Sequence, residues 1–222
     1  MDIASAIERL NSELGQGVTL VAVSKTKPVA DIMEAYEAGQ RIFGENKIQE
    51  MTAKWEQMPK DIVWHMIGHV QRNKVKYMAP FVALIHGVDS LRLLQEIDKQ
   101  AKKHDRTIDC LLQLHIAEES SKFGFNEAEL SEMIASDTFK TLDHVSIKGV
   151  MGMATFTDDQ EQVRREFRHL KQVFDNLKTK LPGIGILSMG MSGDYTLAIA
   201  EGSNMVRIGS SIFGARQYPQ PD

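Results

Sequence analysis

The stretch Val21-Ala22-Val23-Ser24-Lys25-Thr26-Lys27 joins an apolar run to a lysine, and Pro28 follows it directly. Beyond the proline, apolar side chains recur at helical spacing and a glycine ends the pattern: Val29, Ile32, Met33, Tyr36 and Gly39. This segment is predicted to form a strand and then a helix, with Lys25 at the carboxyl end of the strand. Parallel α/β folds place their functional groups at this end. Most lysines in such positions are simply solvated, so a role for Lys25 depends on the rest of the sequence.

The same order, an apolar strand and then a helix, repeats through the chain. Strands are predicted at about residues 18–24, 41–44, 62–67, 82–88, 108–116, 147–151, 185–189 and 205–208. An amphipathic helix precedes them and ends at Gly15 or Gly17. Eight short strands that alternate with helices predict an α/β fold, a (β/α)8 TIM-type barrel with an extra N-terminal helix. An open doubly wound sheet is the alternative.

Polar residues at capping positions predict where several helices begin. Three predicted starts carry a capping side chain: Asp89 or Ser90, Asn126 with Glu129, and Thr157 with Gln160. A shorter helix is predicted from Ser192 to Glu201.

The composition is that of one domain that is neither strongly charged nor rich in cysteine. The 222 residues include 26 Lys and Arg against 30 Asp and Glu, a formal net charge of -4, and neither sign forms a long block. We therefore expect a single domain over residues 1–222 and no binding to nucleic acid. Cys110 is the single cysteine, which excludes an internal disulfide and fits a reducing compartment. Because we find no signal peptide and no run of eighteen apolar residues, we expect a cytoplasmic protein without a membrane partner.

Polar and glycine-rich residues follow five of the predicted strands, and a barrel would bring them to one face. They are Lys25, residues 44–46, His65 with Gly68, residues 188–192 and residues 207–211. Turn and capping requirements explain glycine and serine at any one of these positions. Five such positions on one face favour a binding site.

The last two of these segments are predicted to bind a phosphate. Ser192 would begin a helix, whose dipole and free amides attract anions. Gly209-Ser210 would supply further amides close to the ligand. Loops after the seventh and eighth strands are a common phosphate site in (β/α)8 barrels.

Lys25 and Arg207 narrow the ligand further. An amine in a partly dry pocket loses its proton more readily and then reacts with aldehydes. Pyridoxal 5′-phosphate (PLP) carries both an aldehyde and a phosphate, and Arg207 is placed to meet its pyridine nitrogen. Arginine keeps its protons, so it would leave that nitrogen unprotonated and the ring a weak electron sink. The alternative for Arg207 is a salt bridge at the end of its strand.

Other kinds of site have weaker support. His65 and His69 are four residues apart, but His65 is predicted in a strand, which does not suit the helical two-histidine metal site. Glu118 and Glu119 are expected in a solvated loop rather than as a glycosidase pair. We therefore predict neither a metal ion nor a catalytic carboxylate pair.

Five segments together resemble a known family. They are residues 21–25 (VAVSK), 43–46 (FGEN) with Gln49-Glu50, 64–68 (WHMIG) with Gln71 and Asn73-Lys74, 188–192 (SMGMS) with Asp194, and 206–210 (VRIGS) with Ile212-Phe213-Gly214. With these segments in this order, the chain resembles the pyridoxal phosphate homeostasis protein family, whose members look like the barrel domain of alanine racemase. The resemblance extends over nearly the full chain.

The resemblance implies a PLP-binding barrel of fold type III and a set of cofactor-binding residues. It implies PLP held as an internal aldimine on Lys25, with its phosphate around Ser192, Gly209 and Ser210 and its pyridine nitrogen facing Arg207. The remaining positions that match the lining of the family's cofactor site are Asn46, His65, Ile67 and Met191.

Two functions fit this site. One is a carrier that buffers PLP and supports intracellular vitamin B6 and amino-acid homeostasis, with PLP-dependent apo-enzymes as recipients. The other is a PLP-dependent amino-acid racemase or decarboxylase. Racemases need an acid or base on each face of the substrate carbon, and alanine racemase-like enzymes add a second, β-rich domain that helps to supply it. Because the chain ends soon after the eighth strand and no tyrosine is placed to serve the second face, we expect a carrier, without substantial catalysis and monomeric. A barrel that binds another phosphorylated ligand, or acts as a scaffold, is a third alternative.

Overall fold

Eight parallel strands close into a barrel in chain order. The computed structural model describes residues 2–118 and 123–214. Its strands are β1 (Thr19–Val23), β2 (Ile42–Glu45), β3 (Val63–Met66), β4 (Leu84–Val88), β5 (Ile108–Gln113), β6 (Val145–Met151), β7 (Ile186–Met191) and β8 (Met205–Ile208). The predicted (β/α)8 barrel is confirmed, and the open sheet is excluded because β8 pairs with β1.

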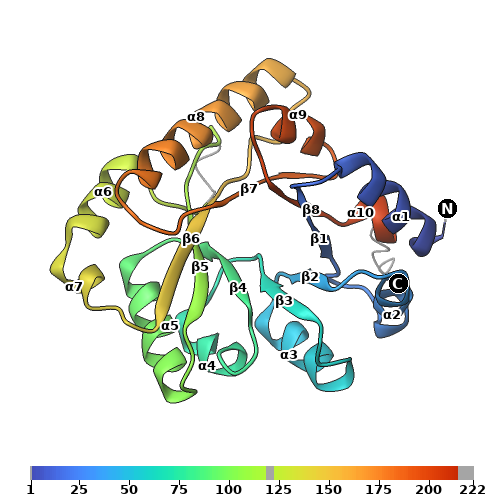
Figure 1. Cartoon of the computed structure of the whole chain (residues 1–222), viewed down its shortest axis with the longest axis horizontal. Helices are drawn as coiled ribbons and strands as arrows, with labels where there is room; N and C mark the ends of the chain where they lie inside the picture. The colour runs from blue at the N-terminus through green and yellow to red at the C-terminus, as the bar shows by residue number, and fades with distance from the viewer. Residues whose placement is uncertain (1, 119–122, 215–222) are drawn as a thin grey trace, which may run out of the picture.

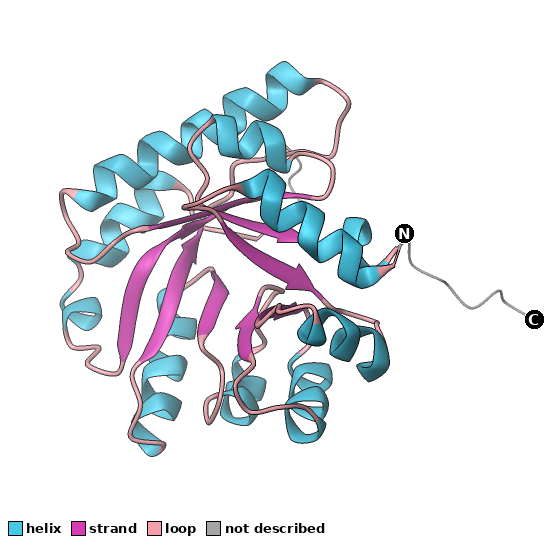
Figure 2. Cartoon of the chain, turned by 45° about the vertical axis from the view of Figure 1, so that its right-hand side comes forward, coloured by secondary structure: helices cyan, strands magenta, loops and turns pink. Residues whose placement is uncertain are grey.

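The helices surround this barrel on the outside (Figure 1). They are α1 (Ile3–Leu14), α2 (Val29–Glu37), α3 (Ile48–Gln57), the 3-10 turn η1 (Arg72–Lys74), α4 (Val75–Met78), α5 (Leu91–Lys103), α6 (Glu127–Ala135), α7 (Asp137–Lys140), α8 (Gln160–Lys178), α9 (Tyr195–Ala200) and α10 (Ser210–Phe213). Figure 2 shows the strands enclosed by these helices. None of the helices in the described ranges is long and apolar enough to cross a membrane.

The additional helix α1 forms for local reasons that the sequence shows. The Asp2 carboxylate caps it by accepting a hydrogen bond from the Ser5 amide at 2.7 Å. Ile7 and Leu10 are fully buried, and Gly15, with φ 67°, ends the helix as predicted. The helix contacts α2 and α10, beside the closure between β1 and β8.

Two apolar layers fill the molecule. One lies between the strands and the helices. The other fills the inside of the barrel with Val21, Leu84, Leu111, Met151 and Met205. Each side chain buried in this way contributes about 1.5–3 kcal/mol of transfer free energy. This inner layer makes the barrel a packed core, so a ligand can only be held at its end.

Most of the predicted caps are confirmed, and one is wrong. Ser90 caps α5, and Asn126 with Glu129 forms the capping box of α6. Helix α8 is capped by Asp159 instead of Thr157, because the Asp159 carboxylate accepts from the amides of Glu161 and Gln162.

Candidate functional site

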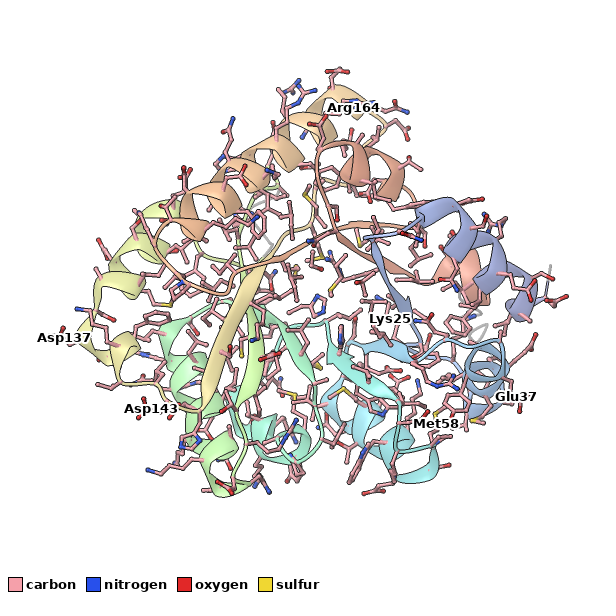
Figure 3. The ribbon with its side chains drawn as sticks, in the orientation of Figure 1. Lys25, Glu37, Met58, Asp137, Asp143 and Arg164 are labelled. Carbon is pink, nitrogen blue, oxygen red and sulfur yellow. The ribbon has the colours of Figure 1, made fainter. Side chains whose placement is uncertain are left out.

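A cavity of about 870 Å³ opens at the carboxyl ends of the strands. Every predicted site residue except His65 lines it: Lys25, Asn46, Ile67, Met191, Ser192, Arg207, Gly209 and Ser210. Figure 3 shows Lys25 inside the ring of helices, whereas Glu37 and Asp137 lie at the periphery. The volume lies in the range typical of small-molecule and cofactor pockets.

Barrel closure brings Lys25 and Arg207 to one cavity from opposite ends of the chain. Val21 pairs with Arg207 across the β1–β8 junction, and Lys25 lies just beyond the end of β1. Lys25 is half-buried in a turn that the Lys27 amide closes by donating to the Ser24 carbonyl at 3.1 Å. The Lys27 ammonium donates to the Phe213 carbonyl at 2.6 Å, which ties this turn to α10.

A close backbone approach shapes the neighbouring wall of the cavity. A Cβ atom at Gly68 would lie 2.4 Å from the Asn46 carbonyl oxygen. Only glycine allows the segments after β2 and β3 to approach so closely. Asn46 and Ile67 therefore line the cavity side by side with the backbone of Gly68.

The rim after β7 differs from its prediction. Helix α9 begins at Tyr195 and not at Ser192, so the expected support of a helix dipole for Ser192 is wrong. The reason is a tight turn before the helix, in which the Asp194 carboxylate accepts from the Met191 amide at 2.6 Å and the Asp194 amide donates to the Met191 carbonyl. A register shift in β7 next to Gly190, with φ 100°, directs this turn over the cavity.

The two predicted phosphate segments do meet. The Gly209 amide donates to the Ser192 hydroxyl at 3.2 Å, which joins the turn after β7 to the start of α10. Ser192, Ser210 and the amides of these turns thus remain a set of neutral donors at the cavity. Ser192 contributes from a turn rather than from a helix end, whereas Gly209 and Ser210 stand at the start of the four-residue helix α10.

Arg207 lies in the barrel interior at the base of the cavity and is almost fully buried. One terminal nitrogen donates to the Ser188 carbonyl at 3.0 Å and to the Ser188 hydroxyl at 2.6 Å, and the other donates to the Gly152 carbonyl at 3.1 Å. Burial lowers the pKa of Arg207 to about 10, while the charge of Asp194 acts in the opposite direction. The guanidinium therefore keeps its positive charge at neutral pH.

A chain of neutral groups continues from Arg207 across the barrel. The Ser188 hydroxyl lies 3.1 Å from His86 Nδ1, and His86 Nε2 lies 3.1 Å from His65 Nδ1. Because Arg207 can only donate, the buried Ser188 proton has its acceptor at His86 Nδ1. This assignment puts the proton of each histidine on Nε2. Burial lowers the pKa of His65 to about 3 and that of His86 well below its usual value, so both rings stay neutral.

The structure thus places His65 differently from the other predicted residues. It lies in the barrel interior, 4% exposed, and joins the cavity through His86 and Ser188. Sequence analysis gave His86 no role, and it included Ser188 in a strand-end segment without assigning it a partner. Their signal was a polar residue at an inward-facing position of an otherwise apolar strand.

The remaining sequence candidates do not form the alternative sites that were considered. His69 lines the cavity, where it stacks on Phe123 with 3.9 Å between the ring centroids and pairs with Asp89, whereas His65 is buried in the barrel interior. No cluster of three or more His, Cys, Asp or Glu able to hold a metal occurs in residues 2–118 and 123–214. Glu119 lies outside the described residues.

The tyrosines within residues 2–118 and 123–214 do not line the cavity. The Tyr36 hydroxyl bonds to Asp61, the Tyr195 hydroxyl donates to Glu13 at 2.8 Å, and Tyr77 is exposed. Tyr218 lies outside the described residues.

A barrel with a lysine beyond β1 and an arginine in β8 defines a class of protein. The family model of the alanine racemase N-terminal domain matches residues 2–217. The pyridoxal phosphate homeostasis protein of Vibrio alginolyticus is 39% identical over 208 residues, which cover 91% of this chain and 88% of that protein. That of Escherichia coli K12 is 39% identical over 205 residues, which cover 90% and 87%. The chain therefore belongs to the pyridoxal phosphate homeostasis protein family.

Solved structures agree with this assignment. PipY of Synechococcus elongatus, solved with PLP bound, is 35% identical and superposes with a TM-score of 0.88 over 96% of this chain and 100% of that one. Alanine racemase of Bartonella henselae is 17% identical, with a TM-score of 0.72 over 99% of this chain and 62% of that one. The second likeness concerns the fold alone.

Proposed function

We propose that this protein binds PLP and carries or buffers it, supporting intracellular vitamin B6 and amino-acid homeostasis without substantial catalysis. The observation that carries the proposal is the single cavity in which Lys25, Arg207 and the hydroxyls of Ser192 and Ser210 meet. The 35% identical PipY, with PLP bound, supports the choice of ligand.

The residues at the cavity fit the chemical groups of PLP. Lys25 is the residue that would bind the aldehyde covalently, and Ser192, Gly209 and Ser210 would hold the phosphate. Asn46, Ile67 and Met191 would line the ring. His65 would lie in the barrel interior and be linked to the cavity through His86 and Ser188. When bound, PLP supplies an aldehyde that condenses with an amine and a ring that can accept electrons.

Arg207 limits what that ring can do. Its guanidinium keeps its protons because its pKa, although burial lowers it to about 10, stays well above neutral pH. The groups that accept from it are the hydroxyl and carbonyl of Ser188 and the Gly152 carbonyl. Facing the pyridine nitrogen, Arg207 would donate a hydrogen bond to it and give it no proton. A ring held in this way is a weak electron sink, which suits storage better than catalysis.

The choice of a carrier over a racemase also depends on which groups could serve the second face of a substrate carbon. Racemisation needs an acid or base on each face of the substrate carbon. Lys25 serves one face, and no tyrosine from residues 2–118 or 123–214 lines the cavity to serve the other. An amino-acid racemase or decarboxylase is therefore the second candidate.

Trapping the cofactor tests the proposal. Purified protein mixed with PLP should show the visible absorbance band of a covalent adduct, and borohydride should fix the cofactor on Lys25, as read by peptide mapping. Lys25→Ala should lose the band completely, while Lys76→Ala, which changes an exposed lysine outside the cavity, should keep it. Attachment at another lysine, or no band, would favour a scaffold or another phosphorylated ligand.

A chirality assay separates the carrier from the enzyme. L-alanine and other amino acids incubated with saturating PLP and protein should keep their configuration. Robust racemisation that disappears in Lys25→Ala would contradict carriage.

The setting of this function is part of the same proposal. We propose a single barrel domain over residues 1–222 that acts as a cytoplasmic monomer and passes PLP to PLP-dependent apo-enzymes. Size-exclusion chromatography with light scattering checks the monomer.

A further inference from the structure

The residue after Lys25 has a backbone conformation that costs free energy. Thr26 has φ 63°, in the left-handed region that β-branched residues rarely adopt. Such a conformation costs on the order of 1–3 kcal/mol and persists only where the surrounding structure imposes it. Some neighbouring group must therefore hold this turn.

Three charged side chains from β2 and α3 contact the turn directly. The Thr26 amide donates to the Glu50 carboxylate at 2.6 Å. The Lys54 ammonium donates to the Ser24 carbonyl at 2.8 Å, and the Ser24 hydroxyl donates to Glu45 at 2.6 Å. The residues on both sides of Lys25 are thus held by one cluster.

The cluster holds itself together through Lys54. Its ammonium lies 2.7 Å from Glu45 and 2.7 Å from Glu50, so its three donors have three acceptors. The Lys54 and Glu45 side chains are 7% and 0% exposed. Two charges buried to this degree keep their positions tightly, because separating them would leave each unpaired in a medium of low dielectric constant.

The cluster lies on the outer side of the barrel wall. Gly44 faces the barrel interior, where an added Cβ would meet Val21 and Ile67, so Glu45 points outward toward α3. Lys25 leads into the cavity on the inner side of the same wall. Glu45, Glu50 and Lys54, which we call the brace, thus leave the cavity unobstructed.

We propose that the brace positions Lys25 for reaction with the aldehyde, by fixing Ser24 and Thr26 on either side of it. This inference rests on the proposed function, because it concerns the residue that binds PLP. The brace residues are positioning residues that do not touch the cofactor. A preset turn lets Lys25 react without first paying the entropy of ordering its loop.

The test is the rate at which the absorbance band forms when PLP is added to the full chain. Glu50→Ala removes the acceptor of the Thr26 amide, and we expect adduct formation to slow about ten- to a hundredfold. The matched control is Asp175→Ala, which breaks another i,i+4 lysine pair, Lys171–Asp175, on α8. The control should react at the wild-type rate.

A second substitution separates positioning from general damage. Asparagine tolerates positive φ far better than threonine, so Thr26→Asn in the Glu50→Ala background should restore most of the lost rate. Circular dichroism and urea unfolding would establish that each variant is folded under the assay conditions. A wild-type rate in Glu50→Ala, equal slowing in Asp175→Ala, or no restoration by Thr26→Asn would overturn the proposal.

A measurement without cofactor keeps this inference separate from the proposed function. Hydrogen exchange of the Thr26 amide should be slow in the unliganded wild type and fast in Glu50→Ala, with the amides of the strands unchanged. An unprotected Thr26 amide in the wild type overturns the brace. Trapping of PLP on another lysine, with Thr26 still protected, overturns the proposed function instead.

Discussion

Two buried polar networks flank the cavity, and they differ in how the buried charges are stabilised. The brace, outside the barrel wall, consists of a cation between two anions. The chain inside the barrel consists of Arg207, Ser188, His86 and His65, in which one cation is hydrogen-bonded to neutral groups. In the first network opposite charges pair with one another. In the second, the positive charge of Arg207 has only neutral hydrogen-bond partners and remains available to a ligand.

The difference follows from what each network faces. Lys54 and Glu45 in the brace are buried against protein, so their charges must pair with each other, while Glu50 is partly exposed. Even so, burial raises the pKa of Glu45, against the opposing effect of Lys54, and its second oxygen is buried without a hydrogen-bond partner. Arg207 faces a cavity, and neutral histidines behind it leave its charge for a ligand. The brace and the inner chain should therefore respond differently to mutation and to pH.

The largest expected effect is that of Lys54→Met. It leaves Glu45 and Glu50 without their cation and should lower the free energy of unfolding by about 3–5 kcal/mol, the usual cost of removing one partner of a buried ion pair. Urea unfolding measures it. Adding Glu45→Gln removes the buried charge and should recover part of the loss. If Lys54→Met alone were as stable as the wild type, the charges of the brace would not be coupled.

Ser188→Ala should have a smaller effect on the inner chain. It removes the partner of His86 Nδ1 and one acceptor of Arg207, and it should cost about 1–3 kcal/mol in the free energy of unfolding. Nitrogen-15 NMR of the imidazoles should show both histidines as neutral Nε2–H tautomers in the wild type and a changed His86 signal in the variant. Nδ1–H tautomers in the wild type would reverse the direction of the chain.

The smallest expected effect is that of mild acid on the inner chain. The pKa of His65 is about 3 in the folded protein, below its usual value of 6.5, so its neutral ring contributes stability that is present above pH 6.5. That contribution is lost as the pH falls, because the unfolded chain then binds the proton. Lowering the pH from 7 to 5.5 should cost about 1.4 kcal/mol for this histidine.

Urea unfolding at each pH provides the measurement, and His65→Asn provides the control. The variant should show a weaker loss of stability over the same interval. An identical pH dependence in both proteins would mean that His65 does not titrate as a buried base.

The contrast between the networks also shows where sequence analysis reached its limit. It predicted Lys25 and Arg207, because each follows or ends an apolar strand and the ends of parallel strands meet. It quoted Glu45 and Glu50 within the family segments without a role, and it did not consider Lys54. Nothing in local spacing shows that a lysine on α3 reaches back to the carbonyl of Ser24.

Ser192 illustrates a second limit. The sequence predicted that a helix begins at Ser192 and that its dipole supports an anion site there. The side chain of Asp194 instead accepts the Met191 amide, and the helix begins three residues later. Asp194 occupies the N-cap position but makes no side-chain cap hydrogen bond to the helix, and local sequence did not show that a turn would precede it.

The sequence by itself determined the barrel and the residues at its mouth, because periodic burial and strand ends are local properties of the chain. Tertiary structure decided which polar groups meet: His65 with His86, Ser188 with Arg207, and Lys54 and Glu50 with the two residues beside Lys25, Ser24 and Thr26. These contacts depend on strand register and on closure between β1 and β8, which hydrophobic periodicity does not specify. The physical reason is that a buried hydrogen bond needs a partner within about 3 Å, and partners far apart in the chain reach that distance only in the folded barrel.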